Sequence, residues 1–295
     1  MMNNNRIDAV FAATRARAAF IPYITCGYPN LDTSRRLLHL LDANGADIIE
    51  LGVPYSDPLA DGPVIQRAAE KALSQGTRLQ DVLSLAERVR AEGLKAGLIL
   101  FSYFNPLLQY GLDRLFPALQ KAGIDGLIVP DLPVGESEPV LQLADAKHIH
   151  LIPLAAPTSL ARLDRIVQAA RGMIYCVSSL GVTGVRQQFH SGLQALLSAL
   201  RERTRLPLVV GFGVSNREQF QQLSYHCDGV VVGSALLREI SALEEALLSD
   251  ETAARNEAER KLAAYVRQLV GAEITGNWLQ SAHEHVNDKN INISN

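Results

Sequence analysis

Three carboxylates stand close together in the first quarter of the chain. Glu50 lies between Ile49 and Leu51 in an apolar run, and Asp57 and Asp61 follow in a loop that contains three prolines. A carboxylate among apolar neighbours is costly to bury without a role or a partner. Burial would raise its pKa and suit it to acid–base chemistry near neutral pH. Glu50 is therefore a candidate general acid–base residue, with an internal ion pair as the alternative interpretation.

The two aspartates each allow two interpretations. Asp57-Pro58 and Asp61-Gly62 are ordinary turn pairs, so each aspartate alone is more typical of a turn than of a catalyst. Loops that follow strands, however, often carry functional side chains on a rigid scaffold. The spacing leaves both interpretations open.

Three short glycine segments indicate a phosphate site. Gly181–Gly184 follows the sixth expected strand, and Gly211–Gly213 and Gly233-Ser234 end the seventh and eighth. The last pair also opens a short expected helix over Ala235–Ile240. Glycine lets backbone N–H groups approach an anion closely, and a helix N-terminus adds a favourable dipole. Barrel enzymes often bind phosphate with the loops after strands seven and eight and a short extra helix. We predict phosphate binding here, with tight turns alone as the alternative.

Two other kinds of site are not expected. A Schiff-base mechanism needs a lysine that faces the site, and no lysine falls at the C-terminal end of an expected strand. A metal site needs histidine and carboxylate ligands together. His148 and His150 precede or begin the fifth expected strand, at its opposite end, and His283–His285 lies in a polar tail. We expect no metal ion and no lysine adduct.

Eight apolar runs must position these residues. They are rich in Ile, Leu and Val and show little polar alternation, which is typical of parallel strands buried on both faces. The expected strands are Phe20–Thr25, Asp47–Gly52, Gly97–Phe101, Gly126–Pro130, His150–Leu154, Met173–Ser178, Leu206–Gly211 and Gly229–Gly233.

Amphipathic stretches alternate with these runs, and glycine follows several of them, as at Gly45, Gly93, Gly123 and Gly172. Eight strand–helix units favour an α/β fold, a (β/α)8 TIM barrel. An open doubly wound sheet is the alternative, but no GxGxxG turn follows the first strand. The expected helices are Leu31–Ala43, Arg78–Ala91, Leu112–Ala122, Glu136–Ala146, Leu160–Ala170, Leu193–Arg203 and Asn216–Leu223, with extra helices over Arg6–Arg17, Ala235–Ile240 and Glu251–Leu269.

Composition limits the function classes. Apolar residues make up 47% of the 295 residues, enough for a sizeable core, and we expect one domain over residues 1–270 with a flexible polar tail over 271–295. The net charge of −3 provides no field for nucleic acid or an anionic membrane. No apolar run approaches the roughly 20 residues that span a bilayer, and the N-terminus resembles no signal peptide. Three widely spaced cysteines indicate a reduced, cytoplasmic protein.

The segment Ile49–Pro63 closely resembles the signature of tryptophan synthase alpha chains, and further segments follow in the family's order over about residues 6–270. The resemblance implies a TIM-barrel lyase of L-tryptophan biosynthesis. It would cleave indole-3-glycerol phosphate by a retro-aldol reaction to indole and D-glyceraldehyde 3-phosphate. The other matching segments are Phe20–Pro29, Tyr103–Pro106, Pro130–Pro133, Gly181–Gly184 and Gly211–Gly213.

The resemblance also implies roles for single residues. Glu50 would be the acid–base residue, which helps to protonate indole C3 and takes the proton of the glycerol hydroxyl next to the broken bond. Asp61 would accept a hydrogen bond from the indole N–H, and Thr183 would close onto Asp61 when substrate is bound. The remaining positions that match are Tyr23, Tyr103 and Tyr175 around the indole and loop, and Gly184, Gly213, Gly233 and Ser234 around the phosphate.

In this family the subunit needs no cofactor, and pyridoxal phosphate belongs to the beta chain of an α2β2 heterotetramer that receives the indole. The loop Pro54–Asp61 and the segment Asn105–Tyr110 resemble the surfaces that face that partner. The pair Ser179-Leu180 departs from the family pattern, which leaves open a stand-alone indole-3-glycerol phosphate lyase. Further alternatives are a catalytically inactive scaffold that activates a partner and a different phosphate-binding barrel.

Overall fold

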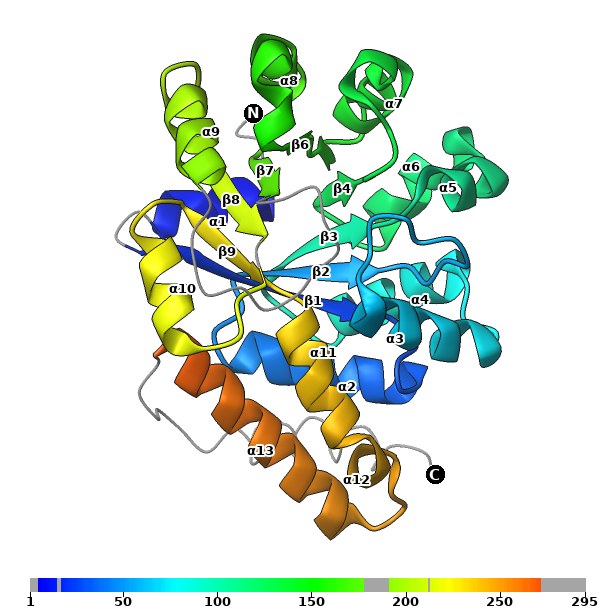
Figure 1. Cartoon of the computed structure of the whole chain (residues 1–295). Coiled ribbons are helices and arrows are strands. Elements are labelled where there is room, and N and C mark those ends of the chain that lie inside the picture. Colours follow the sequence, from blue (N-terminus) through cyan, green and yellow to red (C-terminus); the bar gives the residue numbers. More distant parts are fainter. Residues whose placement is uncertain (1–4, 15–16, 178–190, 212, 272–295) are drawn as a thin grey trace.

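A computed structural model describes residues 5–14, 17–177, 191–211 and 213–271. Its centre is one parallel sheet in the order β5-β4-β3-β2-β1-β9-β8-β7-β6, surrounded by helices (Figure 1). The strands are β1 (Ala19–Thr25), β2 (Ile48–Gly52), β3 (Gly97–Phe101), β4 (Gly126–Ile128), β5 (His150–Leu151), β6 (Leu154–Ala155), β7 (Ile174–Val177), β8 (Leu208–Gly211) and β9 (Gly229–Val232).

The two ends of this sheet belong to one stretch of chain. β5 pairs with β4, and β6 pairs with β7, while only Ile152 and Pro153 separate β5 from β6. The Ile152 N–H donates to Leu127 O at 2.9 Å, and Pro153 O accepts from the Tyr175 N–H at 3.0 Å. The interruption falls at a proline, which has no N–H to donate. The stretch therefore acts as one strand that closes the circle, and the eight-stranded (β/α)8 barrel is confirmed.

Helices cover the outside of the barrel. The α-helices are α1 (Arg6–Ala13), α2 (Leu31–Ala43), α3 (Pro63–Ser74), α4 (Leu79–Ala91), α5 (Phe104–Tyr110), α6 (Leu112–Lys121), α7 (Glu138–Asp145), α8 (Leu163–Ala169), α9 (Ser191–Arg201), α10 (Arg217–Ser224), α11 (Ser234–Ala242), α12 (Glu244–Leu248) and α13 (Thr252–Val270). Two 3-10 turns, η1 (Val134–Glu136) and η2 (Pro157–Arg162), precede α7 and α8.

Local sequence signals explain several of these boundaries. The bounds of α2 match the expected helix because the Asn30 side chain caps it, accepting from the Thr33 N–H at 2.7 Å. All four glycines expected past helix ends have positive φ, between 69° and 98°. The helix expected over Arg6–Arg17 ends earlier, at Ala13, and the one expected from Leu160 begins as a 3-10 turn. Helices α3, α5 and α12 were not expected.

The strands are almost wholly buried, and every residue of β1 and β2 is in the core. At the N-terminal end of the barrel, α1 acts as a plug. Ile7 on α1 is fully buried, and the Asn5 amide donates to Asp125 O at 2.8 Å and to His148 O at 3.0 Å. The barrel is thus closed at this end and must take substrate at the other.

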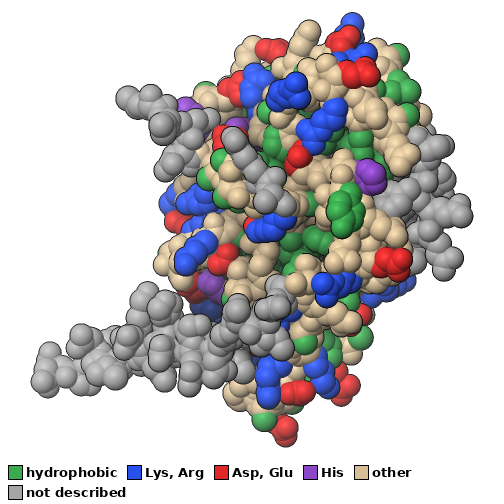
Figure 2. Space-filling view, turned by 90° about the vertical axis from the view of Figure 1, so that its left-hand side faces the viewer, with side chains coloured by type: hydrophobic (Ala, Val, Ile, Leu, Met, Phe, Trp, Pro, Cys, Tyr) green, Lys and Arg blue, Asp and Glu red, His purple; other side chains and the backbone are tan. Residues whose placement is uncertain are grey.

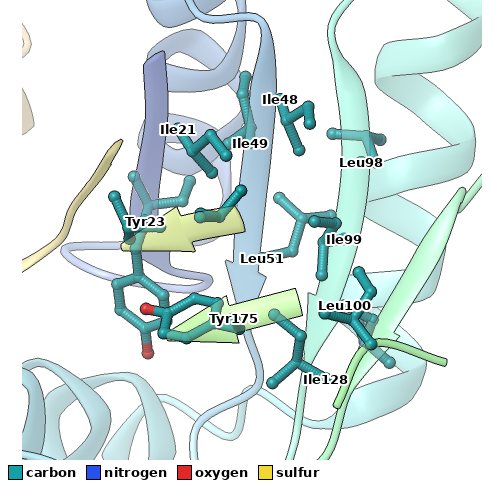
Figure 3. Close-up of a cluster of buried hydrophobic side chains, with 14 of the residues drawn as sticks. Ile21, Tyr23, Ile48, Ile49, Leu51, Leu98, Ile99, Leu100, Ile128 and Tyr175 are labelled. Atoms are coloured by element: carbon teal, nitrogen blue, oxygen red, sulfur yellow. The ribbon is translucent and has the colours of Figure 1, made fainter. Parts of the chain in front are cut away.

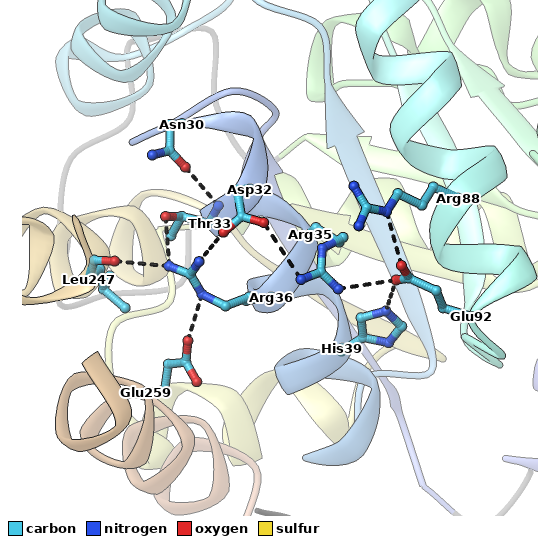
Figure 4. A network of polar contacts seen from close by, with 10 residues as sticks. All are labelled: Asn30, Asp32, Thr33, Arg35, Arg36, His39, Arg88, Glu92, Leu247 and Glu259. Atoms are coloured by element: carbon cyan, nitrogen blue, oxygen red, sulfur yellow. Dashed lines mark hydrogen bonds and ion pairs between the residues drawn. The ribbon is translucent and has the colours of Figure 1, made fainter. Parts of the chain in front are cut away.

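A polar network joins helices of the outer layer on the side of β1 and β2 (Figure 4). Arg36 on α2 donates to Glu259 on α13 at 2.9 Å and to Leu247 O at 2.9 Å. His39, also on α2, lies 2.7 Å from the Glu92 carboxylate at the end of α4. The C-terminal helix and α4 are therefore both fixed to α2, which stabilises the layer behind the second strand.

Positive and negative side chains are interspersed over the left-hand side of the molecule, where α9 and α10 lie (Figure 2). Among the described residues, no helix has the length and apolar character required to cross a membrane. Cys26, Cys176 and Cys227 are free and buried. The expected tail 271–295 lies, except for Gly271, outside the described residues.

Candidate active site

Glu50 is the third residue of β2, and its side chain is 1% exposed. Its backbone neighbours in the sheet are Tyr23 on β1 and Ile99 on β3. Within the described part of the chain, the Oε1 atom has no hydrogen-bond partner, so the alternative of an internal ion pair is not supported. Burial raises the pKa of Glu50 to about 8. A carboxyl with this pKa can both give and take a proton near neutral pH.

Asp61 is the last residue of the Pro54–Asp61 loop, two positions before the start of α3, and it is 7% exposed. The Tyr103 hydroxyl donates to Asp61 Oδ2 at 3.2 Å and accepts from the Ala60 N–H at 2.8 Å. Burial raises the pKa of Asp61 to about 6, although the hydrogen bond from Tyr103 opposes this rise. Asp57, by contrast, is exposed, and its carboxylate accepts from the neighbouring Ser56 hydroxyl at 2.7 Å while its backbone carbonyl accepts from the Leu59 N–H at 2.9 Å. Its geometry is that of a turn residue.

Two buried tyrosines lie near both carboxyl groups. Tyr23 on β1 and Tyr175 on β7 are buried, and their rings lie beside each other in the barrel (Figure 3). Burial is the largest cause that raises the pKa of each phenol, and the negative charges of Glu50 and Asp61 raise both further. The two carboxyl groups and the two hydroxyls therefore lie within electrostatic range of one another. The structure brings Glu50, Asp61, Tyr23, Tyr103 and Tyr175 to one end of the barrel.

A helix N-terminus opens beside this group. Gly233 precedes α11, no side chain caps the first turn, and Ser234 is the first helical residue. A Cβ atom on Gly233 would lie 3.4 Å from the Tyr23 side chain, so the helix begins next to the tyrosine pair. Gly213 follows β8, the strand adjacent to β9. Thr183 and Gly184 lie outside the described residues.

The histidine expected at the start of the fifth strand lies elsewhere, as expected. His150 begins β5 at the N-terminal end of the barrel, where its Nε2 atom lies 3.0 Å from the Asp8 carboxylate on α1. Within the ranges that the structure describes, no three His, Cys, Asp or Glu side chains are grouped so that they could hold a metal ion. The predicted absence of a metal stays a prediction.

Sequence reasoning gave no role to two residues of this site. Gly52 follows Glu50 by two positions on β2, and Phe101 is its partner in the register with β3. The Tyr23 ring lies against both residues, with a ring–ring distance of 5.7 Å to Phe101. Alternation along the strand could have placed Gly52 on the same face as Glu50, but only the register shows which ring fills the space above it.

The geometry is that of a barrel with two buried carboxylates and an uncapped helix N-terminus beside them, and comparison with known proteins identifies its family. The family model described as "Tryptophan synthase alpha chain" matches residues 11–268. The chain belongs to the tryptophan synthase alpha chain family. It is 46% identical over 256 residues to the tryptophan synthase alpha chain of Geobacillus sp. (strain WCH70), covering 87% of this chain and 97% of that protein. The identity to the Bacillus subtilis (strain 168) alpha chain is 45% over 252 residues, covering 85% and 94%.

Solved structures agree with this membership. The tryptophan synthase subunit alpha of Legionella pneumophila str. Paris superimposes with a TM-score of 0.78 at 34% identity, covering 90% of this chain and 99% of that one. A Mycobacterium tuberculosis tryptophan synthase structure gives a TM-score of 0.77 at 38% identity, covering 89% and 98%. The likeness therefore extends over nearly the whole length of both structures.

Proposed function

We propose that this chain is the lyase subunit of a tryptophan synthase, which cleaves indole-3-glycerol phosphate into indole and D-glyceraldehyde 3-phosphate. The observation that carries the proposal is the carboxyl of Glu50, buried in the middle of β2 with Oε1 free of partners among the described residues. The reaction must add a proton to indole C3 and remove one from the glycerol hydroxyl. A group with a pKa of about 8 performs both transfers near neutral pH.

Asp61 supplies the second charge that the reaction needs. Protonation at C3 leaves a positive charge on the ring, and a carboxylate that accepts a hydrogen bond from the indole N–H stabilises it. With a pKa of about 6, Asp61 is mostly ionised at neutral pH while Glu50 is mostly protonated. The two carboxyl groups therefore start in different protonation states, which suits one to accept a hydrogen bond and the other to donate a proton.

The phosphate end of the substrate has a matching site. We assign it to the N-terminus of α11 with Gly233 and Ser234, together with Gly213 and the predicted position Gly184, while Thr183 is assigned to closure onto Asp61. Uncapped N–H groups of a first helical turn and the helix dipole both favour an anion. We also propose that the chain carries no cofactor of its own.

Exposed apolar side chains support a partner. Leu59 in the Pro54–Asp61 loop is 93% exposed, and Leu108 on α5 is 50% exposed. The two segments meet where the Asn105 amide donates to the Tyr55 hydroxyl at 3.4 Å. We propose that this surface faces a beta chain in an α2β2 tetramer, in which the partner holds pyridoxal phosphate, and that the complex acts in the cytoplasm.

The test is indole release from indole-3-glycerol phosphate, measured with and without a beta chain. Indole formation that accelerates when the beta chain is added, with co-purification of the two chains, supports the proposal. No indole under either condition contradicts it. A turnover of about 1–10³ s⁻¹ by the isolated chain, unchanged by the beta chain, would instead favour a stand-alone lyase.

A further inference from the structure

The Tyr23 ring leans along the barrel axis from the level of Glu50 to the level of Gly52. Tyr23 and Glu50 are register partners on neighbouring parallel strands, so their side chains point to the same face. A Cβ atom on Gly52 would lie 2.1 Å from the Tyr23 hydroxyl and 2.5 Å from the ring carbon that carries it. The end of the ring thus occupies the place where a side chain of residue 52 would be.

A second ring reaches the same place from the other side of β2. Phe101 on β3 is the register partner of Gly52, and its ring meets that of Tyr23 edge to face, with centroids 5.7 Å apart at 86°. β1 and β3 flank β2, so this contact must cross over β2. It can do so only because Gly52 has no side chain. The two rings form an aromatic bridge, Tyr23–Phe101, one layer above Glu50 toward the C-terminal end of the barrel.

From this geometry we propose that the aromatic bridge Tyr23–Phe101 over Gly52 is a positioning device that shields the Glu50 carboxyl from bulk water. The catalytic relevance of this shielding rests on the proposed function, in which Glu50 carries out the proton transfers. The shielding itself is a property of the resting protein. It explains why Glu50 is 1% exposed although it lies near the open end of the barrel.

Other groups also face Glu50. Ile99 flanks it from β3 without charge. Tyr175 faces it from across the barrel, and the Glu50 charge raises the pKa of the Tyr175 phenol. No cation among the described residues forms an ion pair with Glu50. Burial is the cause that raises its pKa, so the bridge that produces the burial should control the proton affinity of the carboxyl.

The inference is tested by titrating Glu50 directly. The full chain is labelled with 13C-carboxyl glutamate, and the Glu50 resonance is assigned from its absence in Glu50→Gln. We expect the pKa of Glu50 to fall by about one to three units in Tyr23→Ala, since water then reaches the carboxyl. Tyr23→Phe keeps the ring and should leave the pKa at its wild-type value. Phe101→Ala opens the bridge from the other side and should act as Tyr23→Ala does, so it serves if Tyr23→Ala does not fold.

The matched control is Tyr55→Ala. Tyr55 stacks on Tyr103 with ring centroids 5.1 Å apart, so this variant removes a ring of equal size from a second aromatic pair and should leave the pKa of Glu50 unchanged. A wild-type pKa in folded Tyr23→Ala or Phe101→Ala overturns the inference, as does a shift of equal size in Tyr55→Ala. The proposed function fails separately, if Glu50→Gln cleaves indole-3-glycerol phosphate at the wild-type rate while the titrations behave as expected.

Discussion

Two buried carboxylates at opposite ends of the barrel differ in what surrounds them. Asp125, just before β4 at the N-terminal end, is 5% exposed, and Glu50 at the C-terminal end is 1% exposed. Asp125 accepts from Arg6 at 3.0 Å, from Arg90 at 2.8 Å and from the Leu98 N–H at 2.9 Å. The Oε1 atom of Glu50 has no such partner in the described part of the chain.

The difference in hydrogen-bond donors indicates that Asp125 contributes to stability and Glu50 to chemistry. A buried charge with several donors stabilises the fold around it, because removal of one member leaves the others unpaired. A buried carboxyl without donors destabilises the fold whenever it ionises, and such a group is retained for its reactivity. We therefore propose that the N-terminal end of the barrel is built for stability, and that the C-terminal end gives up stability for acid–base chemistry.

The largest stability loss should follow from Asp125→Ala. It leaves the guanidinium of Arg90, whose side chain is only 10% exposed, without its carboxylate. We expect the free energy of unfolding to fall by about 3–5 kcal/mol in urea denaturation. Asp164→Ala, which removes an exposed partner of Arg203, is the control and should cost less than about 1 kcal/mol. Equal losses in both variants would remove the contrast between the two ends.

Glu50→Gln should raise the free energy of unfolding relative to the wild type, the opposite of Asp125→Ala. The folded-state pKa of Glu50 lies above the unfolded value of about 4.5, so the folded protein binds the extra proton and wild-type stability falls as the pH rises from about 4.5 to 8. The glutamine variant lacks this dependence. Relative to the wild type it should gain stability between pH 5 and pH 8, by at most about 1.4 kcal/mol per pH unit. A stability difference that stays constant over this range would show that Glu50 is not held protonated.

Gly211→Ala tests the packing at the C-terminal end. The Tyr175 ring occupies the place of a side chain at Gly211, as the Tyr23 ring does at Gly52. An added Cβ atom on Gly211 would lie 2.3 Å from the Tyr175 hydroxyl. The ring must move, and we expect a loss of about 1–3 kcal/mol in the free energy of unfolding, with weaker substrate binding. Gly135→Ala is the control, since nothing lies within 4 Å of its added Cβ atom. Full stability and unchanged KM in Gly211→Ala would mean that the site is loosely packed.

The smallest effect is expected for Tyr103→Phe. The variant loses the hydrogen bond that holds the pKa of Asp61 down, so the acid limb of the pH–rate profile should move to higher pH. One hydrogen bond of about 0.5–1.5 kcal/mol corresponds to a rise of about 0.4–1.1 units in the pKa of Asp61, which lowers turnover by up to about twofold near pH 7 and by more at lower pH. Tyr55→Phe removes a hydroxyl that does not contact Asp61 and is the control. An unmoved acid limb in Tyr103→Phe would show that Tyr103 does not control Asp61.

Local patterns in the sequence predict much of the barrel. The amphipathic pattern over Leu31–Ala43 predicted the bounds of α2, which the structure shows to be capped by Asn30, and the apolar runs predicted all eight strand positions. Helix α3 could have been expected from Gly62-Pro63, because proline is favoured in the first helical turn. The split of the fifth strand at Pro153 depends on pairing with two neighbours, which no local pattern contains.

The contacts between distant segments could not be predicted in this way. Position along β2 indicated that Glu50 would be buried, and the structure adds that Oε1 has no described partner. The bond between Tyr103 and Asp61 joins residues 42 positions apart, and the aromatic bridge over Gly52 requires the register of three strands. Residue type and position in the sequence therefore predicted the candidate residues, while tertiary packing determines which groups surround them.

The central proposal for this site is that Glu50 transfers the protons in the cleavage of indole-3-glycerol phosphate. The most direct test is the rate of indole release from indole-3-glycerol phosphate by Glu50→Gln, measured at a temperature at which the variant is fully folded. The structure predicts a fall of about 10²–10⁴-fold, the usual contribution of a general acid–base group, without any loss of stability. Indole release at the wild-type rate by the folded variant would contradict it.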